Sequence, residues 1–129
     1  MKQPIIKIES EEQIYNKWAK LTEYKLQYTS DRMDDIVSRV VFDSGDGAAI
    51  LLVNPKTEKI LLVEQFRYGT YFNTPDEAMM LEVCAGIVDD SDPVATAIRE
   101  AEEETGYRIT KIDHIATVYP TPGADTEKL

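Results

Sequence analysis

The sequence predicts an α+β fold in a chain of 129 residues. Short apolar segments recur along most of the chain and are separated by turn residues, which is typical of strands. One stretch, residues 93–105, has the apolar spacing and the end signals of a helix. The hydrophobic fraction of 43% is sufficient for a modest globular core. We therefore expect mostly strands, with one well-defined helix.

The N-terminal region is compatible with two structures. Over residues 1–21, Ser10 and Gln13 are spaced as in a capping box, and the apolar residues that follow would line one face of a helix. From Tyr24 the apolar period changes to two, and after a polar turn a second apolar run, IVSRVVF, covers residues 36–42. We expect a β-hairpin from Tyr24 onward.

Two central strands are expected next, joined by a turn. The first is AAILLVN (48–54), which follows the turn SGDG (44–47), and the second is ILLVEQFRY (60–68). A looser segment, GTYFNTPDEA (69–78), then leads into a short strand, MMLEVC (79–84). These segments would form the strands around which the rest of the chain packs.

The helix is bounded by local signals. Asp92 can cap its N-terminus, Pro93 suits its first turn, and Gly106 can end it. Beyond the helix, a final strand is expected near Ile112 to Tyr119.

The carboxylates at the end of this helix are unfavourable there. Glu100, Glu102, Glu103 and Glu104 oppose the helix macrodipole, at roughly 0.3–1 kcal/mol each if they are exposed. Glu100 shares one face with Glu103 and Glu104, which adds ~0.2–0.5 kcal/mol of repulsion per pair. Arg99 could offset part of this as a surface ion pair. The spacing alone leaves a solvated acidic face and a cation site both open.

The composition argues against several functions. A formal net charge of −10 disfavours binding to nucleic acid or to an anionic membrane, so a phosphate-bearing ligand would need metal ions or local arginines. Cys84, the single cysteine, is expected to be buried, and one histidine, His114, cannot support a multi-histidine metal site. No apolar run approaches the ~20 residues of a membrane span, and the N-terminus lacks the apolar core of a signal peptide. We expect a cytoplasmic protein.

Residues 85–107, AGIVDDSDPVATAIREAEEETGY, resemble the signature box of the Nudix hydrolases, in which a glycine and a loop precede a helix that ends in Arg-Glu-x-x-Glu-Glu-x-Gly. Here that core is REAEEETG, residues 99–106. The box differs from the common pattern in having Asp92 where glutamate is usual and in being one residue shorter before Arg99. The shorter box and the stretches SGDGAAILLVN and VEQFRYGTYFN are similar to the branch that hydrolyses nucleoside diphosphate sugars, especially GDP-mannose pyrophosphatases.

The resemblance implies the Nudix fold, a mixed β-sheet sandwiched by helices. Residues 46–129 would be the catalytic domain, and residues 1–45 would form an N-terminal β-hairpin arm. Members of this branch pair their N-terminal strands with a partner subunit, which favours strand over helix for residues 10–29 and implies a homodimer. The family fold has further strands and a terminal helix, so we expect this chain to be truncated at its C-terminus.

The resemblance also implies a Mg²⁺ site, with Mn²⁺ as an alternative ion. Its ligands would be the carbonyl of Ala85 and the carboxylates of Glu100, Glu103 and Glu104, which would also be the catalytic groups. Hard oxygen donors suit Mg²⁺. Arg99 would orient these glutamates, although a simple ion pair on the helix surface would have the same geometry.

Three further residues are implied at the substrate. Arg67 and Arg39 would contact phosphate or sugar oxygens, and Glu82 would line the pocket. A surface role for Arg39 and an exposed strand position for Glu82 stay open.

The function implied is that of a Mg²⁺-dependent pyrophosphohydrolase. It would cleave a nucleoside diphosphate sugar, similar to GDP-mannose, into a nucleoside monophosphate and a sugar phosphate. ADP-ribose hydrolysis is the second enzymatic hypothesis. A hypothesis of another class is a non-catalytic, nucleotide-binding Nudix module or an inactive fragment.

Overall fold

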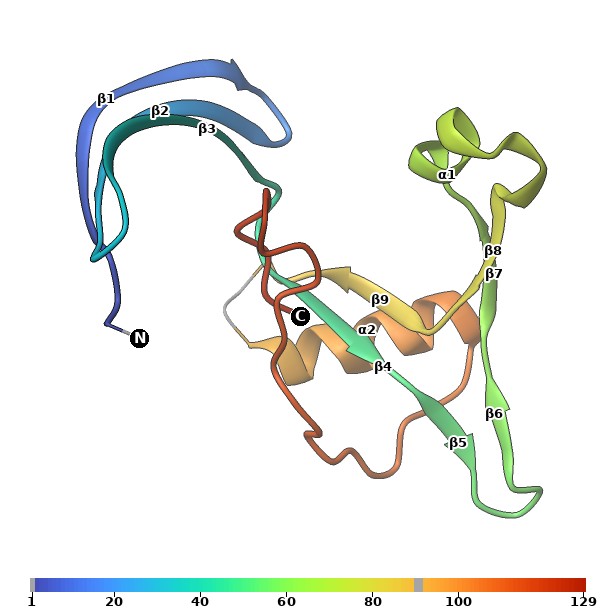
Figure 1. The fold of residues 1–129 in the computed structure, drawn as a ribbon. Coiled ribbons are helices and arrows are strands. Elements are labelled where there is room, and N and C mark those ends of the chain that lie inside the picture. The colour runs from blue at the N-terminus through green and yellow to red at the C-terminus, as the bar shows by residue number, and fades with distance from the viewer. Residues whose placement is uncertain (1, 90–91) are drawn as a thin grey trace. The chain divides into compact units, whose positions relative to one another are not determined.

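The computed structural model describes residues 2–89 and 92–129. Within that part, strands dominate, accompanied by two α-helices and one short 3-10 helix, which confirms the α+β class (Figure 1). The chain divides into two compact units. The first contains the residues up to Asp46 together with Thr117–Lys128, and the second contains Gly47–Ala116 and Leu129.

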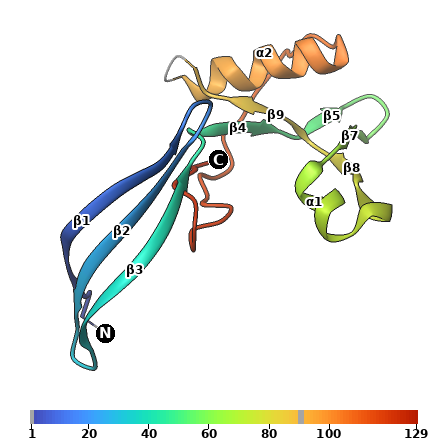
Figure 2. The same cartoon turned by 90° about the horizontal axis from the view of Figure 1, so that it is seen from above.

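The first unit is built on a three-stranded antiparallel sheet, in the order β1-β2-β3. Its strands are β1 (Ile5–Asn16), β2 (Lys20–Thr29) and β3 (Asp34–Asp43). The first pair runs from Ile5 opposite Thr29 to Asn16 opposite Lys20. Figures 1 and 2 show these strands from two directions as long, curved neighbours.

The helix considered for residues 1–21 is wrong. Ser10 and Gln13 lie inside β1, where they face Lys25 and Thr22 of β2. A capping signal stabilises only a helix that also has a face to pack, because isolated short helices are marginal in water. The β1 backbone instead finds hydrogen-bond partners along almost its whole length. The strand that the family resemblance implied for residues 10–29 is the one observed, apart from the turn at 17–19.

The C-terminal segment of the first unit is tied to the end of β3. The Phe42 amide donates to the Ala124 carbonyl at 2.8 Å, and the Thr126 amide donates to the Phe42 carbonyl at 3.1 Å. The Phe42 ring also packs edge-on against Trp18, with centroids 5.8 Å apart. The two hydrogen bonds anchor C-terminal residues that have no regular secondary structure of their own.

The second unit contains three two-stranded antiparallel ladders. They pair β4 (Gly47–Ile50) with β9 (Cys84–Ile87), β5 (Leu52–Asn54) with β6 (Lys59–Leu61), and β7 (Val63–Phe66) with β8 (Met79–Glu82). The mixed sheet that the resemblance implied is not formed here: among the described residues, the parallel pairing recorded is an isolated bridge between Phe42 and Asp125. Leu51 and Leu62 each stand outside the ladders and divide the two expected central strands into shorter ones.

Two segments differ from the sequence-based expectation. The region expected to be loose holds α1 (Tyr68–Asn73) and the 3-10 helix η1 (Pro75–Glu77). The strand expected near Ile112 to Tyr119 is absent, since residues 106–119 carry neither helix nor strand. Apolar alternation makes a segment suitable for a sheet, but a strand forms only where its backbone finds a partner ladder.

The helix α2 (Pro93–Thr105) packs against β4 and β9 (Figures 1 and 2). Its buried residues are small, Thr96, Ala97 and Ala101, and this lets the helix approach the buried Ala48 and Cys84 closely. The end signals work as predicted: an Asp92 carboxylate oxygen accepts from the amides of residues 94 and 95, and Gly106 adopts a left-handed φ of 72°. Neither helix of the described residues is long and apolar enough to cross a membrane.

The Asp92 cap gives a first testable prediction. Asp92→Ala should lower the free energy of unfolding by about 1 kcal/mol, because two amides of the first turn lose their acceptor. Asp92→Asn is the matched control, since its side-chain oxygen can still accept both bonds. Urea unfolding followed by circular dichroism measures the difference, and an equal loss in both variants would contradict a capping role.

Candidate active site

The carboxylate of Glu100 lies directly on Gly86. Glu100 is the most protected of the glutamates that pair with Arg99, with its side chain 18% exposed. A Cβ added at Gly86 would collide with the Cγ, Cδ and Oε1 atoms of Glu100. The absence of a side chain on β9 therefore creates the space in which this carboxylate rests.

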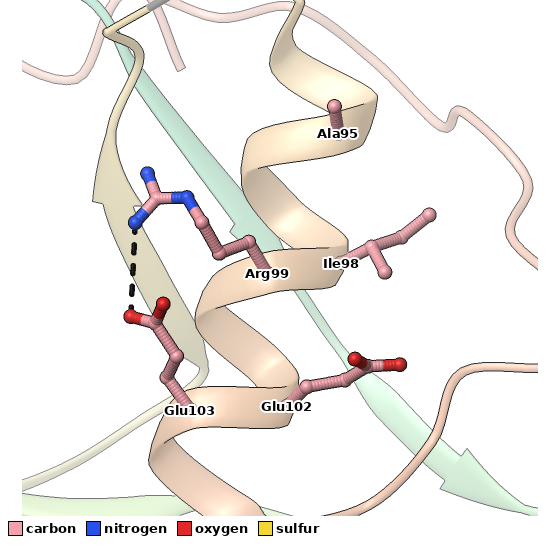
Figure 3. A pocket seen from close by; sticks show the side chains of 5 residues that line it. All are labelled: Ala95, Ile98, Arg99, Glu102 and Glu103. Carbon is pink, nitrogen blue, oxygen red and sulfur yellow. Dashed lines mark ion pairs between the residues drawn. The ribbon is translucent and has the colours of Figure 1, made fainter.

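Arg99 connects three acidic side chains. Its Nη1 lies 2.9 Å from Oε1 of Glu100 and 3.7 Å from Oε2 of Glu103, and its Nη2 lies 3.5 Å from Oδ2 of Asp89. Arg99 and Glu103 project to the same side of the helix (Figure 3). The arginine thus offsets the repulsion that the sequence predicted at this end of α2. The contact with Asp89 was not anticipated.

Glu104 is held differently from the other two glutamates. Its Oε1 accepts a hydrogen bond of 2.8 Å from Nε2 of Gln65 on β7. Cys84 is fully buried, as predicted, and its burial and then its interaction with Glu104 raise the pKa of the thiol. Sequence reasoning missed Gln65: it stands in the stretch VEQFRYGTYFN that carries the resemblance, but only the tertiary structure brings it to α2.

Arg67 and Glu82 form a forked ion pair. Nε of Arg67 lies 2.8 Å and 3.0 Å from the two carboxylate oxygens of Glu82, and Nη2 makes a further bond to Oε2. The hydrogen bonds from Arg67 lower the pKa of Glu82, and the same bonds raise the pKa of Arg67. Glu104 adds to the rise in the Arg67 pKa through its charge. The structure therefore brings Arg67, Glu82 and Glu104 into one electrostatic neighbourhood.

Arg39 and Ala85 complete the set of predicted residues. Arg39 lies on β3 in the first unit, opposite Tyr24, and its guanidinium donates to the Ser38 carbonyl at 2.7 Å. The residues of the box belong to the second unit. Ala85 precedes Gly86 on β9 and faces Ala49 of β4.

The outer side of α2 carries an open hollow (Figure 3). It is lined by Ala95, Ile98, Arg99, Glu102 and Glu103. Glu102 and Ile98 project away from the side on which Arg99 and Glu103 meet.

The box residues fit a hard divalent cation by chemistry. Across residues 2–89 and 92–129, no three histidine, cysteine, aspartate or glutamate side chains converge closely enough to hold a metal ion. Instead, the guanidinium of Arg99 provides the positive charge between Glu100 and Glu103. The donors nearby are carboxylate oxygens, which Mg²⁺ prefers, and Gly86 leaves room for Glu100 among them.

The Arg67–Glu82 pair gives a prediction about acid stability. The pKa of Glu82 is lower in the folded chain than its ordinary value of 4.5, so the pair stabilises the fold above that pH and ceases to do so as the pH falls through the folded pKa. Between about pH 5 and pH 3, the free energy of unfolding of Glu82→Gln should therefore fall by roughly 0.5–1 kcal/mol less than that of wild type. The difference is small because the pair is partly exposed and screened.

Glu64→Gln on the neighbouring strand is the matched control for charge. Urea unfolding at a series of pH values tests this prediction. The same acid dependence in wild type and Glu82→Gln would contradict it.

Comparison with known protein families assigns the chain to one of them. The NUDIX domain model matches residues 43–128, and the protein belongs to this family. The match covers the strands of the second unit, the glycine of the box and the whole of α2.

The curated relatives include several proteins called GDP-mannose pyrophosphatase. The protein of Yersinia pestis (strain Pestoides F) is 41% identical over 111 residues, which cover 85% of this chain and 56% of the relative. That of Yersinia enterocolitica serotype O:8 is 38% identical over 125 residues, which cover 95% of this chain and 65% of the relative. That of Cronobacter sakazakii is 42% identical over 89 residues, which cover 69% of this chain and 47% of the relative. The chain thus spans about half to two thirds of the length of these relatives.

Proposed function

We propose that this protein is a divalent-cation-dependent Nudix hydrolase that cleaves a nucleoside diphosphate sugar, similar to GDP-mannose, into a nucleoside monophosphate and a sugar phosphate. The observation that carries the proposal is the box itself, in which Glu100, Glu103 and Glu104 stand within five positions of α2 and the missing side chain of Gly86 accommodates Glu100. The similarity to GDP-mannose pyrophosphatases over most of this chain supports the choice of substrate class.

In this proposal, the carboxylates of Glu100, Glu103 and Glu104 and the carbonyl of Ala85 hold the cation, Mg²⁺ or Mn²⁺. When bound, the ion neutralises the diphosphate oxygens and makes phosphorus more open to attack by water. Arg99 already contacts Glu100 and Glu103, and it keeps the two carboxylates together before a cation binds. A carboxylate of this set accepts the proton of the attacking water while the phosphoanhydride bond breaks.

Arg67 is proposed to bind the substrate. Glu82 is proposed to set the orientation of the Arg67 guanidinium in the substrate pocket. A guanidinium carries five N–H donors in a fixed fork. The pair with Glu82 uses Nε and Nη2 of Arg67, which leaves the Nη1 donors for a phosphate or sugar oxygen. Arg39 is proposed as a second substrate contact.

We also propose a homodimer, formed through an arm of residues 1–45 that precedes a catalytic domain of residues 46–129, in a cytoplasmic protein. The first strand of this arm carries exposed isoleucines at 5, 6 and 8, with exposures of 72%, 47% and 57%. Exposed apolar residues of this kind favour association. Sedimentation of a clean monomer would contradict the dimer.

The experiment that tests the substrate class is a parallel assay on GDP-mannose, ADP-ribose and a dinucleoside polyphosphate, with Mg²⁺ or with EDTA. Release of nucleoside monophosphate from GDP-mannose, dependent on Mg²⁺ and faster than from the other two, is expected. Preferred cleavage of ADP-ribose would move the protein to the second hypothesis. Binding of nucleotide sugar without any product would instead support a non-catalytic module.

A further inference from the structure

Gln65 lies outside the box and donates a hydrogen bond to one of its glutamates. Its Nε2 donates to Oε1 of Glu104 at 2.8 Å, across a separation of 39 residues in the sequence. Gln65 lies on β7 opposite Met80 and is partly buried. It therefore connects a strand of the second unit to the last turn of α2.

Glu104 is held by a neutral group, whereas Glu100 and Glu103 are held by a charged one. Glu100 and Glu103 are held by the guanidinium of Arg99, which brings a full positive charge. The amide of Gln65 is neutral, so it fixes the direction of Glu104 without cancelling the negative charge. One carboxylate oxygen, Oε1, takes part in this bond.

We infer that Gln65 is a positioning residue that orients the Glu104 carboxylate for a divalent cation. The inference rests on the proposed function, because it takes Glu104 as a ligand of the ion. Partners that orient metal ligands in this way are typically worth 10–100-fold in metal affinity. Gln65 acts only through Glu104 and needs no contact with the substrate.

The test compares Mn²⁺ affinity in the full chain, measured by electron paramagnetic resonance of the free ion. Gln65→Met keeps the size of the side chain but removes the donor, and it should weaken Mn²⁺ binding by about tenfold. Gln27→Ala is the control, because it removes a similar glutamine–carboxylate bond, 2.7 Å to Asp34, on β2. The control should bind within about twofold of wild type. Thermal unfolding without metal reports any purely structural effect.

A double-mutant cycle separates orientation from general damage. In a Glu104→Ala background, Gln65→Met should cause no additional loss of affinity, because the side chain that Gln65 orients has gone. Equal Mn²⁺ affinity in wild type and Gln65→Met, or an equal loss in Gln27→Ala, would overturn the inference alone. A wild-type chain that binds no Mn²⁺ would overturn both the inference and the proposed function.

Discussion

Replacing Glu103 and Glu104 together by glutamine is expected to reduce Mg²⁺-dependent release of nucleoside monophosphate by about 100-fold or more. Each amide keeps the shape of the carboxylate but loses the charge that holds a hard cation. Glutamine at 104 can still accept the bond from Gln65, so the local packing is retained. The loss would therefore report on charge and not on misfolding.

The same substitution should raise the stability of the protein. Two negative charges leave the last turns of α2, where each opposes the macrodipole by roughly 0.3–1 kcal/mol. Lower activity together with higher stability is the pattern of a helix that maintains a costly charge cluster for function. A merely structural role for the two glutamates predicts that activity and stability fall together.

Glu102→Gln is the matched control for this double variant. It removes one negative charge from the same helix, at an exposed position that projects away from Arg99 and Glu103 (Figure 3). Turnover should stay within about twofold of wild type, while stability rises by about half as much as in the double variant. Unchanged turnover in the double variant itself would contradict both enzymatic hypotheses.

Gly86→Ala is the second substitution with a large expected effect. The new methyl group would occupy the space that now holds the Glu100 carboxylate, so Glu100 must rotate away from β9 and from Arg99. We expect at least a tenfold loss of Mg²⁺ affinity, comparable to the loss of an orienting contact. Turnover should fall at least as much, and titration calorimetry with Mg²⁺ measures the affinity directly.

Two controls test whether the effect of Gly86→Ala comes from the collision with Glu100. Gly123→Ala adds the same methyl group where no atom lies within 4 Å, and it should change neither Mg²⁺ affinity nor turnover. In a Glu100→Ala background, Gly86→Ala should have almost no cost in stability, because the colliding side chain is gone. A clear loss of stability in that background would show that Gly86 is needed for another reason.

The parts of the fold that sequence predicted well depend on local signals. The helix α2 begins after Asp92 and ends at Gly106, because a cap and a left-handed glycine act within one turn of the chain. The burial of Cys84 also follows from its own apolar segment. These signals need no knowledge of distant residues.

The errors occur where long-range pairing decides. Ser10 and Gln13 match a capping box, yet the ladder with β2 makes their segment a strand. The alternation near Ile112 to Tyr119 suits a strand, yet the segment has no ladder among the described residues. Local patterns express a preference, whereas partner strands determine the outcome.

The site shows the same division. The spacing of Glu100, Glu103 and Glu104 on one helical face is readable from the sequence, because it depends only on the helical repeat. Two other contacts are not readable from the sequence. Gln65 and Glu104 lie on different elements, and Arg99 and Asp89 are joined only through the loop before α2. The stretch VEQFRYGTYFN contains Gln65, but its pattern does not show which side chain of α2 the glutamine contacts.

The most direct test of the account is to locate the bound cation. Mn²⁺ added to the isotopically labelled chain broadens the nuclear magnetic resonance signals of nearby amides, and excess Mg²⁺ should reverse the effect. We expect the signals of Gly86 and of residues 100–104 to broaden first and to recover with Mg²⁺. Broadening spread evenly over the acidic surface, with α2 no more affected than β1, would contradict a cation site at the box.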